Sequence, residues 1–121
     1  MQLIDTFFKV HGMQVNATEA QVTGVLNPQH PIFKAHFPGH PITPGVCIVR
    51  LATELLSLVT GRRLTLVKAK NVKFLNLVIP DGETILDFFF SKLSADGDTV
   101  TCTLVVKSDS SVYSKLSLVY E

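Results

Sequence analysis

The sequence predicts an α+β fold in which one long helix is followed by several antiparallel strands. Residues 46–60 carry apolar side chains at helical spacing over a wide face, so most of this helix should be buried. After Gly61, segments rich in β-branched and apolar residues alternate with short turn sequences, which is typical of strands. A sheet that follows a single buried helix has to cover it, so we expect the sheet to wrap around the helix.

The first third of the chain predicts short elements separated by breaks. Residues 1–12 suit a short helix or an extended segment. Residues 15–26 predict one or two strands, with Gly24 as a bulge or bend. Residues 27–31 contain two prolines that interrupt this region, and residues 32–35 form a short apolar segment before a loop.

The predicted helix extends from residue 46 to about residue 60, and Gly61 is a suitable residue to end it. Four strands are expected after it, over residues 64–79, 84–93, 99–107 and 112–120, with turns at 80–82, 95–98 and 108–111. The sequence has no repeat, linker or low-complexity segment. We therefore expect one domain over residues 1–121.

The composition favours a protein that associates with a copy of itself or with a relative. Hydrophobic residues make up 46% of the chain and charged residues only 17%, so much of the surface should be apolar. A net charge of +1 argues against a nucleic-acid-binding protein.

One basic cluster stands out, and it suits either a solvated strand edge or the docking of an acidic carrier protein. It comprises Arg62, Arg63, Lys68, Lys70 and Lys73.

Nothing in the sequence indicates a secreted, membrane-spanning or metal-binding protein. Cys47 and Cys102 are too few and too far apart for a disulfide framework or a metal site, and Cys47 suits core packing. No apolar run approaches the roughly 20 residues that span a bilayer, and the N-terminus does not resemble a signal peptide. We expect a cytoplasmic protein without a metal, nucleotide or redox cofactor.

A stiff loop precedes the helix and ends where the helix begins. Three prolines and two glycines fall between Pro38 and Gly45, and proline restricts both itself and the residue before it. The free N–H groups of the helix N-terminus therefore lie within a few residues of His36. A histidine beside unpaired N–H donors suits the binding of a polarised carbonyl group.

Two segments resemble the 3-hydroxyacyl-[acyl-carrier-protein] dehydratases of the FabZ and FabA type. The first is His36-Phe37-Pro38-Gly39 followed by Pro41-Ile42-Thr43-Pro44-Gly45-Val46. The second is Val72-Lys73-Phe74-Leu75-Asn76-Leu77-Val78-Ile79-Pro80-Asp81-Gly82, in which the family has Pro-Gly-Asp at the turn. The resemblance implies the hotdog fold, a sheet curled around one helix, with the active site at a dimer interface.

The resemblance also implies roles for individual residues. His36 would be the acid/base that acts on a 3-hydroxyacyl thioester, and the Gly45 backbone N–H would polarise the thioester carbonyl. The substrate would be carried by acyl-carrier protein or coenzyme A, and the basic cluster would dock the carrier. The residues expected to line the acyl site are Phe33, Phe37, Pro44, Val46 and Arg50.

The chain departs from the family at the catalytic carboxylate, which in the family lies fourteen residues after the histidine. Here that residue is Arg50, and the nearest acidic residue on the helix is Glu54, one turn later. Arg50 could pair with Glu54, contact a substrate carboxylate or phosphate, or belong to a heterodimer whose partner supplies a Glu. Glu54 could also be the relocated catalytic acid.

Three functions follow from these features. The first is a FabZ-like dehydratase that acts on acyl thioesters in fatty-acid or related lipid or polyene biosynthesis. The second is a hotdog thioesterase, which would use a carboxylate to activate water and would release a free acid. The third is a non-catalytic, dehydratase-like subunit that completes the active site of a paralogue.

Overall fold

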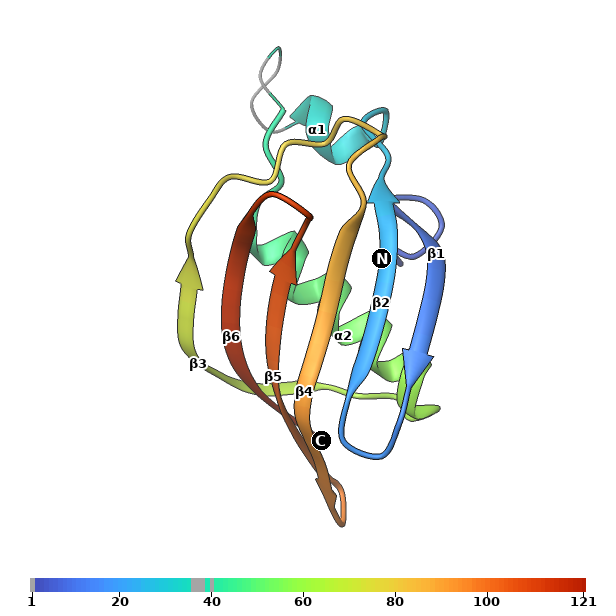
Figure 1. The fold of residues 1–121 in the computed structure, drawn as a ribbon, viewed down its shortest axis with the longest axis vertical. Helices are drawn as coiled ribbons and strands as arrows, with labels where there is room; N and C mark the ends of the chain where they lie inside the picture. Colours follow the sequence, from blue (N-terminus) through green and yellow to red (C-terminus); the bar gives the residue numbers. More distant parts are fainter. Residues whose placement is uncertain (1, 36–38, 40) are drawn as a thin grey trace.

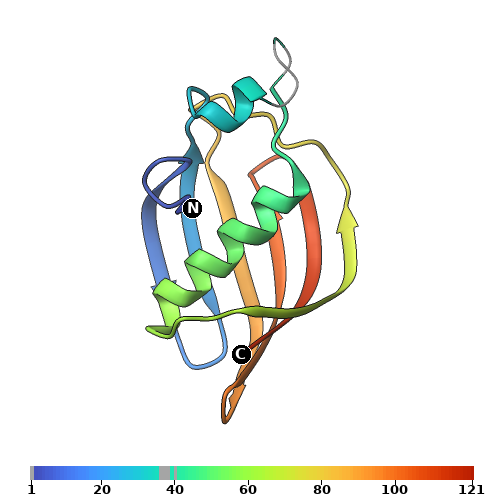
Figure 2. The same ribbon diagram turned by 180° about the vertical axis from the view of Figure 1, so that it is seen from behind.

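Six antiparallel strands form one sheet, and the long helix α2 lies across one face of it (Figure 1, Figure 2). The structure is a computed structural model, and it describes residues 2–35, 39 and 41–121. The elements are β1 (Phe8–Val15), β2 (Ala20–Leu26), α1 (Pro31–Ala35), α2 (Gly45–Thr60), β3 (Leu66–Phe74), β4 (Leu86–Asp96), β5 (Thr99–Lys107) and β6 (Val112–Tyr120).

The strand order in the sheet is β1-β2-β4-β5-β6-β3, and each neighbouring pair is antiparallel. β1 and β3 are therefore the two edge strands. The segment between α2 and β3 crosses the face of the sheet that carries α2, behind the strands in Figure 1 and in front of them in Figure 2, and leads to the edge opposite β1. The predicted arrangement, a sheet wrapped around one central helix, is confirmed.

The core lies between α2 and the inner face of the sheet. Alternate residues of β4, β5 and β6 are buried, as expected for strands with one face on a core. The helix contributes Ile48, Leu51, Ala52, Leu55 and Leu56, each at most 1% exposed. Burial of these side chains stabilises the helix on the sheet by about 1.5–3 kcal/mol for each large aliphatic residue.

Both ends of α2 follow from the sequence. Pro44 precedes the first helical residue and has an extended conformation, with φ −62° and ψ 144°. Gly61 follows the last residue and adopts the left-handed conformation, with φ 68°, which most other residues reach only with strain. The predicted helix over residues 46–60 is thus confirmed to within one residue.

The N-terminal third differs from the prediction at Gly24. The bulge lies on β1, where the register shifts between Val10 and Gly12, and β2 pairs through Gly24 without interruption. A Cβ atom on Gly24 would lie 2.2 Å from the Lys9 carbonyl oxygen and 2.7 Å from Cζ of Phe8. Gly24 is therefore required for a close approach between the strands, and its prediction as a bulge was wrong.

The bounds of two other strands also differ from the prediction. The strand expected over residues 64–79 ends at Phe74, and the strand expected over 84–93 continues to Asp96. The chain from Leu75 to Ile85 contains no strand, because it passes over the end of the sheet to reach β4 (Figure 1). The strands over residues 99–107 and 112–120 match the prediction. Among the described helices, none combines the length and the hydropathy that crossing a membrane requires.

Candidate active site

The first turn of α2 offers two backbone donors. Pro44 has no N–H, and its carbonyl oxygen accepts hydrogen bonds from the N–H groups of Cys47 and Ile48, at 3.0 and 3.3 Å. The N–H groups of Gly45 and Val46 have no acceptor among the residues that the structure describes. Helix N-termini leave such donors unsatisfied, and a carbonyl oxygen that gains negative charge is a suitable acceptor for them.

The two segments that carry the family resemblance meet at this helix terminus. The Thr43 N–H donates to the Val78 carbonyl oxygen at 2.8 Å. The ring of Phe74 lies against Gly45, where a Cβ atom would come within 2.7 Å of its Cζ. Phe74 is 53% exposed, so its side chain contacts Gly45 and also faces solvent. Glycine at position 45 therefore leaves room for this ring.

Two of the predicted site residues, His36 and Phe37, lie outside the described residues, so their roles stay predictions. The other residues predicted to line the acyl site differ in exposure. Phe33 is buried and its ring stacks on Phe7 with a centroid distance of 5.1 Å, as part of the core. Pro44 is half-buried, and Val46 is 75% exposed at the start of the helix.

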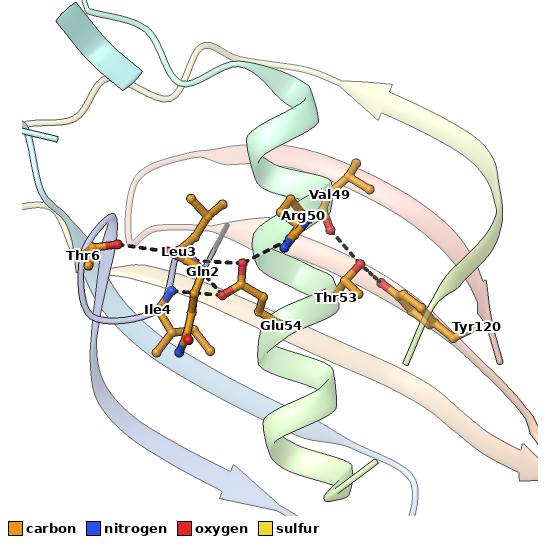
Figure 3. A network of polar contacts seen from close by, with 9 residues as sticks. All are labelled: Gln2, Leu3, Ile4, Thr6, Val49, Arg50, Thr53, Glu54 and Tyr120. Atoms are coloured by element: carbon orange, nitrogen blue, oxygen red, sulfur yellow. Dashed lines mark hydrogen bonds and ion pairs between the residues drawn. The ribbon is translucent and has the colours of Figure 1, made fainter. Parts of the chain in front are cut away.

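Glu54 binds the N-terminal segment (Figure 3). Its Oε1 accepts hydrogen bonds from the N–H groups of Leu3 and Ile4, at 2.7 and 3.1 Å. Its Oε2 accepts from the Leu3 N–H at 2.9 Å and from Nε of Arg50 at 3.3 Å. The Glu54 side chain is 14% exposed and that of Arg50 is 52% exposed. These contacts give Glu54 a structural role, whereas a catalytic role stays a prediction.

Behind the helix, Tyr120 and Cys102 are buried and uncharged. The Tyr120 hydroxyl is hydrogen-bonded to Oγ1 of Thr53 at 3.3 Å, and Thr53 also donates to the Val49 carbonyl (Figure 3). Burial raises the pKa of Tyr120 to about 12 and that of Cys102 to about 12. Both groups are therefore protonated near neutral pH.

Cys47 is also buried, and its pKa is also raised. It is 8% exposed in the first turn of α2, and burial raises the pKa of its thiol. The cause is the loss of solvent around the thiol, which disfavours the thiolate. Cys47 packs in the core, as the sequence indicated.

A groove of about 1390 Å³ runs along the solvent side of α2. The N-terminal segment borders it on one side, and residues 61–66 border it on the other. Arg62 on this border donates from Nη2 to the Gly97 carbonyl at 3.1 Å, which ties it to the β4–β5 turn. The groove brings together five of the residues predicted from the sequence, namely Val46, Arg50, Glu54, Arg62 and Arg63.

The basic cluster does not form one surface. Arg62 and Arg63 line the groove on the helix side, whereas the three lysines lie on β3. Lys68, Lys70 and Lys73 pair with Val119, Ser117 and Lys115 of β6. These β6 residues alternate with the buried ones and belong to the outer face of the sheet. The lysines and the arginines therefore lie on opposite sides of the sheet.

Sequence reasoning missed two features of this region. Phe74 was part of the family-like segment, but only its contact with Gly45 shows that it borders the helix terminus. The binding of Glu54 to the N–H groups of Leu3 and Ile4 had no sequence signal, because backbone donors carry no residue signature. The sequence allows a pair between Arg50 and Glu54, and the structure contains it.

Similar proteins of known structure share this fold. A chain of the dehydratase heterocomplex ApeI:P from Xenorhabdus doucetiae superposes with a TM-score of 0.79 at 18% identity, over 93% of this chain and 96% of that one. A Streptococcus mutans protein bound to acetyl-CoA gives a TM-score of 0.66 at 13% identity, over 97% and 89%. A mutant thioesterase from Pseudomonas aeruginosa gives 0.64 at 11% identity, over 93% and 78%. The fold is the hotdog fold.

Sequence comparison points to the dehydratases among these proteins. The chain is 26% identical over 93 residues to the 3-hydroxyacyl-[acyl-carrier-protein] dehydratase FabZ of Xylella fastidiosa (strain M23). This match covers 60% of the chain and 58% of that relative, so the chain spans less than two thirds of its length. The family model of the ApeI-like proteins, described as ApeI dehydratase, matches residues 12–112. Because this match covers most of the chain, the protein belongs to the ApeI-like family of FabZ-like, hotdog-fold dehydratases.

Proposed function

We propose that this protein takes part in the dehydration of 3-hydroxyacyl thioesters in fatty-acid or related lipid or polyene biosynthesis. The observation that carries the proposal is the pair of N–H donors at Gly45 and Val46, which have no acceptor within the described part of the chain. They belong to the segment that resembles the active-site motif of the dehydratases. A thioester carbonyl that accepts from them would be polarised, and its C2 proton would become more acidic.

The proposed reaction needs one base, one acid and this carbonyl site. His36 removes a proton from C2, and the negative charge that develops on the thioester oxygen is stabilised by the Gly45 N–H. The C3–O bond then breaks, and the hydroxyl group leaves as water after it accepts a proton. The products are an α,β-unsaturated thioester and water, so no oxidant or reductant is needed. Phe74 and Val46 border the carbonyl site and would contact the acyl chain.

The leaving hydroxyl group has to be protonated by an acid. Arg50 replaces the family carboxylate, and Glu54 already accepts hydrogen bonds from Leu3, Ile4 and Arg50. We propose that a paralogue supplies the carboxylate in a heterodimer. A heterocomplex is known for the dehydratase ApeI:P of X. doucetiae, which has the same fold.

The thioester would be presented by acyl-carrier protein or by coenzyme A. Arg63 is exposed at the border of the groove beside α2, and we propose that it contacts the phosphate of a pantetheine arm. Arg62 donates a hydrogen bond to the Gly97 carbonyl. Its replacement should therefore affect the β4–β5 turn as well as the docking of the carrier. The β3 lysines would meet a carrier only from the outer side of the sheet.

Thioester hydrolysis is the second candidate function, because thioesterases occur among the proteins with the same fold. Hydrolysis needs a carboxylate that activates water. Glu54 is the nearest one on the helix, but three of its four hydrogen bonds are to the N-terminal backbone. Dehydration through His36 is therefore the better-supported proposal.

The test is mass spectrometry of a 3-hydroxyacyl-carrier protein incubated with the purified protein. Loss of water is expected, weakly from the chain alone and more strongly after addition of a paralogue that carries a helix Glu. His36→Ala should abolish the reaction, whereas His11→Ala should not, because His11 is exposed on β1. Glu54→Gln should leave the reaction in place if Glu54 is structural.

Other products would overturn the proposal. Release of a free 3-hydroxy acid would establish a thioesterase. Dehydration that survives His36→Ala would exclude His36 as the acid/base. Dehydration by the isolated chain that is lost in Glu54→Gln, with unchanged stability, would move the catalytic acid to Glu54 and remove the need for a partner carboxylate.

A further inference from the structure

β3 is an edge strand whose free side has to be covered. It pairs with β6 on one side only, and eight of its nine residues are exposed. Eleven large apolar side chains are exposed in the described part of the chain, and six of them lie on β3 or directly after it. These six are Val67, Val72, Phe74, Leu75, Leu77 and Ile79. An exposed apolar edge strand with unpaired backbone groups tends to pair with a strand of another chain.

Two irregularities of β3 keep its lysines on the outer face of the sheet. The register shifts between Leu66 and Lys68, which leaves Val67 as an extra residue. It shifts again between Lys70 and Lys73, where Asn71 has a φ of 52°. Each bulge changes which side chains point outward. Without the second bulge, Lys73 would point to the face opposite that of Lys68 and Lys70.

The outer corner of the sheet at β3 and β6 therefore carries four positive charges. Lys73 pairs directly with Lys115, and like charges in directly opposed positions repel each other. Within residues 2–35, 39 and 41–121, no ion pair joins any of these lysines to an acidic side chain. The charge of this corner is thus available to a partner. Its residues are Lys68, Lys70, Lys73 and Lys115.

A second copy of the chain is a poor partner for this edge. Two identical β3 strands related by a two-fold axis would pair antiparallel, with their outer faces on the same side. Any register that pairs most of the two strands would place one lysine row beside the other. The apolar residues favour the contact, but the lysine rows oppose it.

We propose that the β3 edge selects a different chain, one whose own edge strand carries Asp or Glu on its outer face. This inference rests on the heterodimer of the proposed function and names the chemistry by which the partner is recognised. The apolar residues supply the contact area. The lysine row discriminates between a partner with an acidic edge strand and a second copy of this chain. Acidic side chains opposite it would turn repulsion into attraction, while identical chains would be kept apart.

A charge-inverted copy of this chain can serve as the acidic partner. In the variant Lys68→Glu, Lys70→Glu, Lys73→Glu, the edge keeps its apolar residues and changes only its charge. The control variant Lys9→Glu, Lys34→Glu, Lys92→Glu has the same net charge, and its three exposed positions lie outside β3. Dissociation constants are measured by energy transfer between dyes on C-terminal tags, for each chain with itself and with the unmodified chain.

We expect the unmodified chain to bind the β3 variant at least about tenfold more tightly than it binds itself in dilute salt. The difference should nearly vanish at about 1 M salt, where exposed charges are screened. The control variant should show a much smaller gain. Circular dichroism and thermal unfolding check that both variants fold, and the single substitution Lys70→Glu should give a smaller gain of the same sign.

Three results would overturn the inference. They are equal affinity of the unmodified chain for itself and for the β3 variant, an equal gain with the control variant, and no association in any mixture. The measurement contains no substrate, so it separates this inference from the proposed reaction. Chains that associate as expected and do not dehydrate a thioester would contradict the reaction alone.

Discussion

At the scale of single residues, the contact between Gly45 and Phe74 connects the sequence motif to the site. The two residues are far apart in the chain, yet a Cβ atom at position 45 would touch the far end of the Phe74 ring. Because the ring is half-exposed, it can move away at little cost. Its movement would alter the space beside the backbone donors, which is where a substrate carbonyl is expected.

Gly45→Ala should therefore reduce catalysis more than stability. We expect a loss of about tenfold in kcat/KM for the thioester, through displacement of the Phe74 ring and crowding at the donor. The free energy of unfolding should change by less than about 1 kcal/mol. Steady-state kinetics of the active assembly and urea unfolding are the measurements.

Gly61→Ala is the matched control, with the opposite pattern. Nothing lies within 4 Å of a Cβ atom there, but the φ of 68° is strained for alanine. It should cost about 1 kcal/mol of stability and reduce kcat/KM much less than Gly45→Ala does. A loss of kcat/KM in Gly61→Ala equal to that in Gly45→Ala would contradict the assignment.

Glu54 is the second residue with a specific prediction. Glu54→Ala removes the acceptor for the Leu3 and Ile4 N–H groups. The expected loss is about 2 kcal/mol in the free energy of unfolding, because these part-buried donors lose a charged partner. Glu19→Ala, at an exposed position, should stay within about 0.5 kcal/mol. Equal small effects in both variants would show that Glu54 does not anchor the N-terminal segment.

At the scale of elements, the β1–β2 hairpin depends on one missing side chain. Gly24→Ala would place Cβ 2.2 Å from the Lys9 carbonyl oxygen, and a backbone atom cannot move away as a side chain can. We expect a loss of about 3 kcal/mol in the free energy of unfolding. Gly12→Ala in the same hairpin, with its nearest contact 3.4 Å away at Thr23 Oγ1, should cost less than about 1 kcal/mol. Urea unfolding of both variants checks the difference.

At the scale of the whole molecule, two buried and protonated groups, Tyr120 and Cys102, predict that the folded protein loses stability at alkaline pH. Burial raises the pKa of Tyr120 and of Cys102 to about 12, from ordinary values of 10.0 and 9.0. Above pH 9 the unfolded chain loses these protons first, so raising the pH favours unfolding. The stability from these groups is complete below pH 9 and is lost as the pH rises through about 12.

Tyr120→Phe tests this pH dependence. The variant removes one of the groups that titrate in this range, so the fall in stability between pH 10 and 12 should become less steep. At neutral pH it should cost only about 1 kcal/mol, because Thr53 keeps its hydrogen bond to the Val49 carbonyl. Thermal unfolding over a pH series is the measurement. An unchanged slope would show that Tyr120 does not titrate with folding.

The sequence by itself determined the features that depend on local patterns. The bounds of α2, the strands at residues 99–107 and 112–120, and the family resemblance all follow from residue spacing, turn residues and a short motif. Such patterns are readable because the side-chain period of a helix or strand is set by its own backbone.

Only the tertiary structure decided how distant segments meet. The Glu54 carboxylate binds backbone N–H groups some fifty residues away, and Phe74 lies against Gly45. Two bulges place the β3 lysines on the outer face, away from the arginines of the same sequence cluster. A bulge shifts the strand period by one residue, and backbone donors carry no residue signature. These features therefore depend on which strands and loops become neighbours in the folded chain.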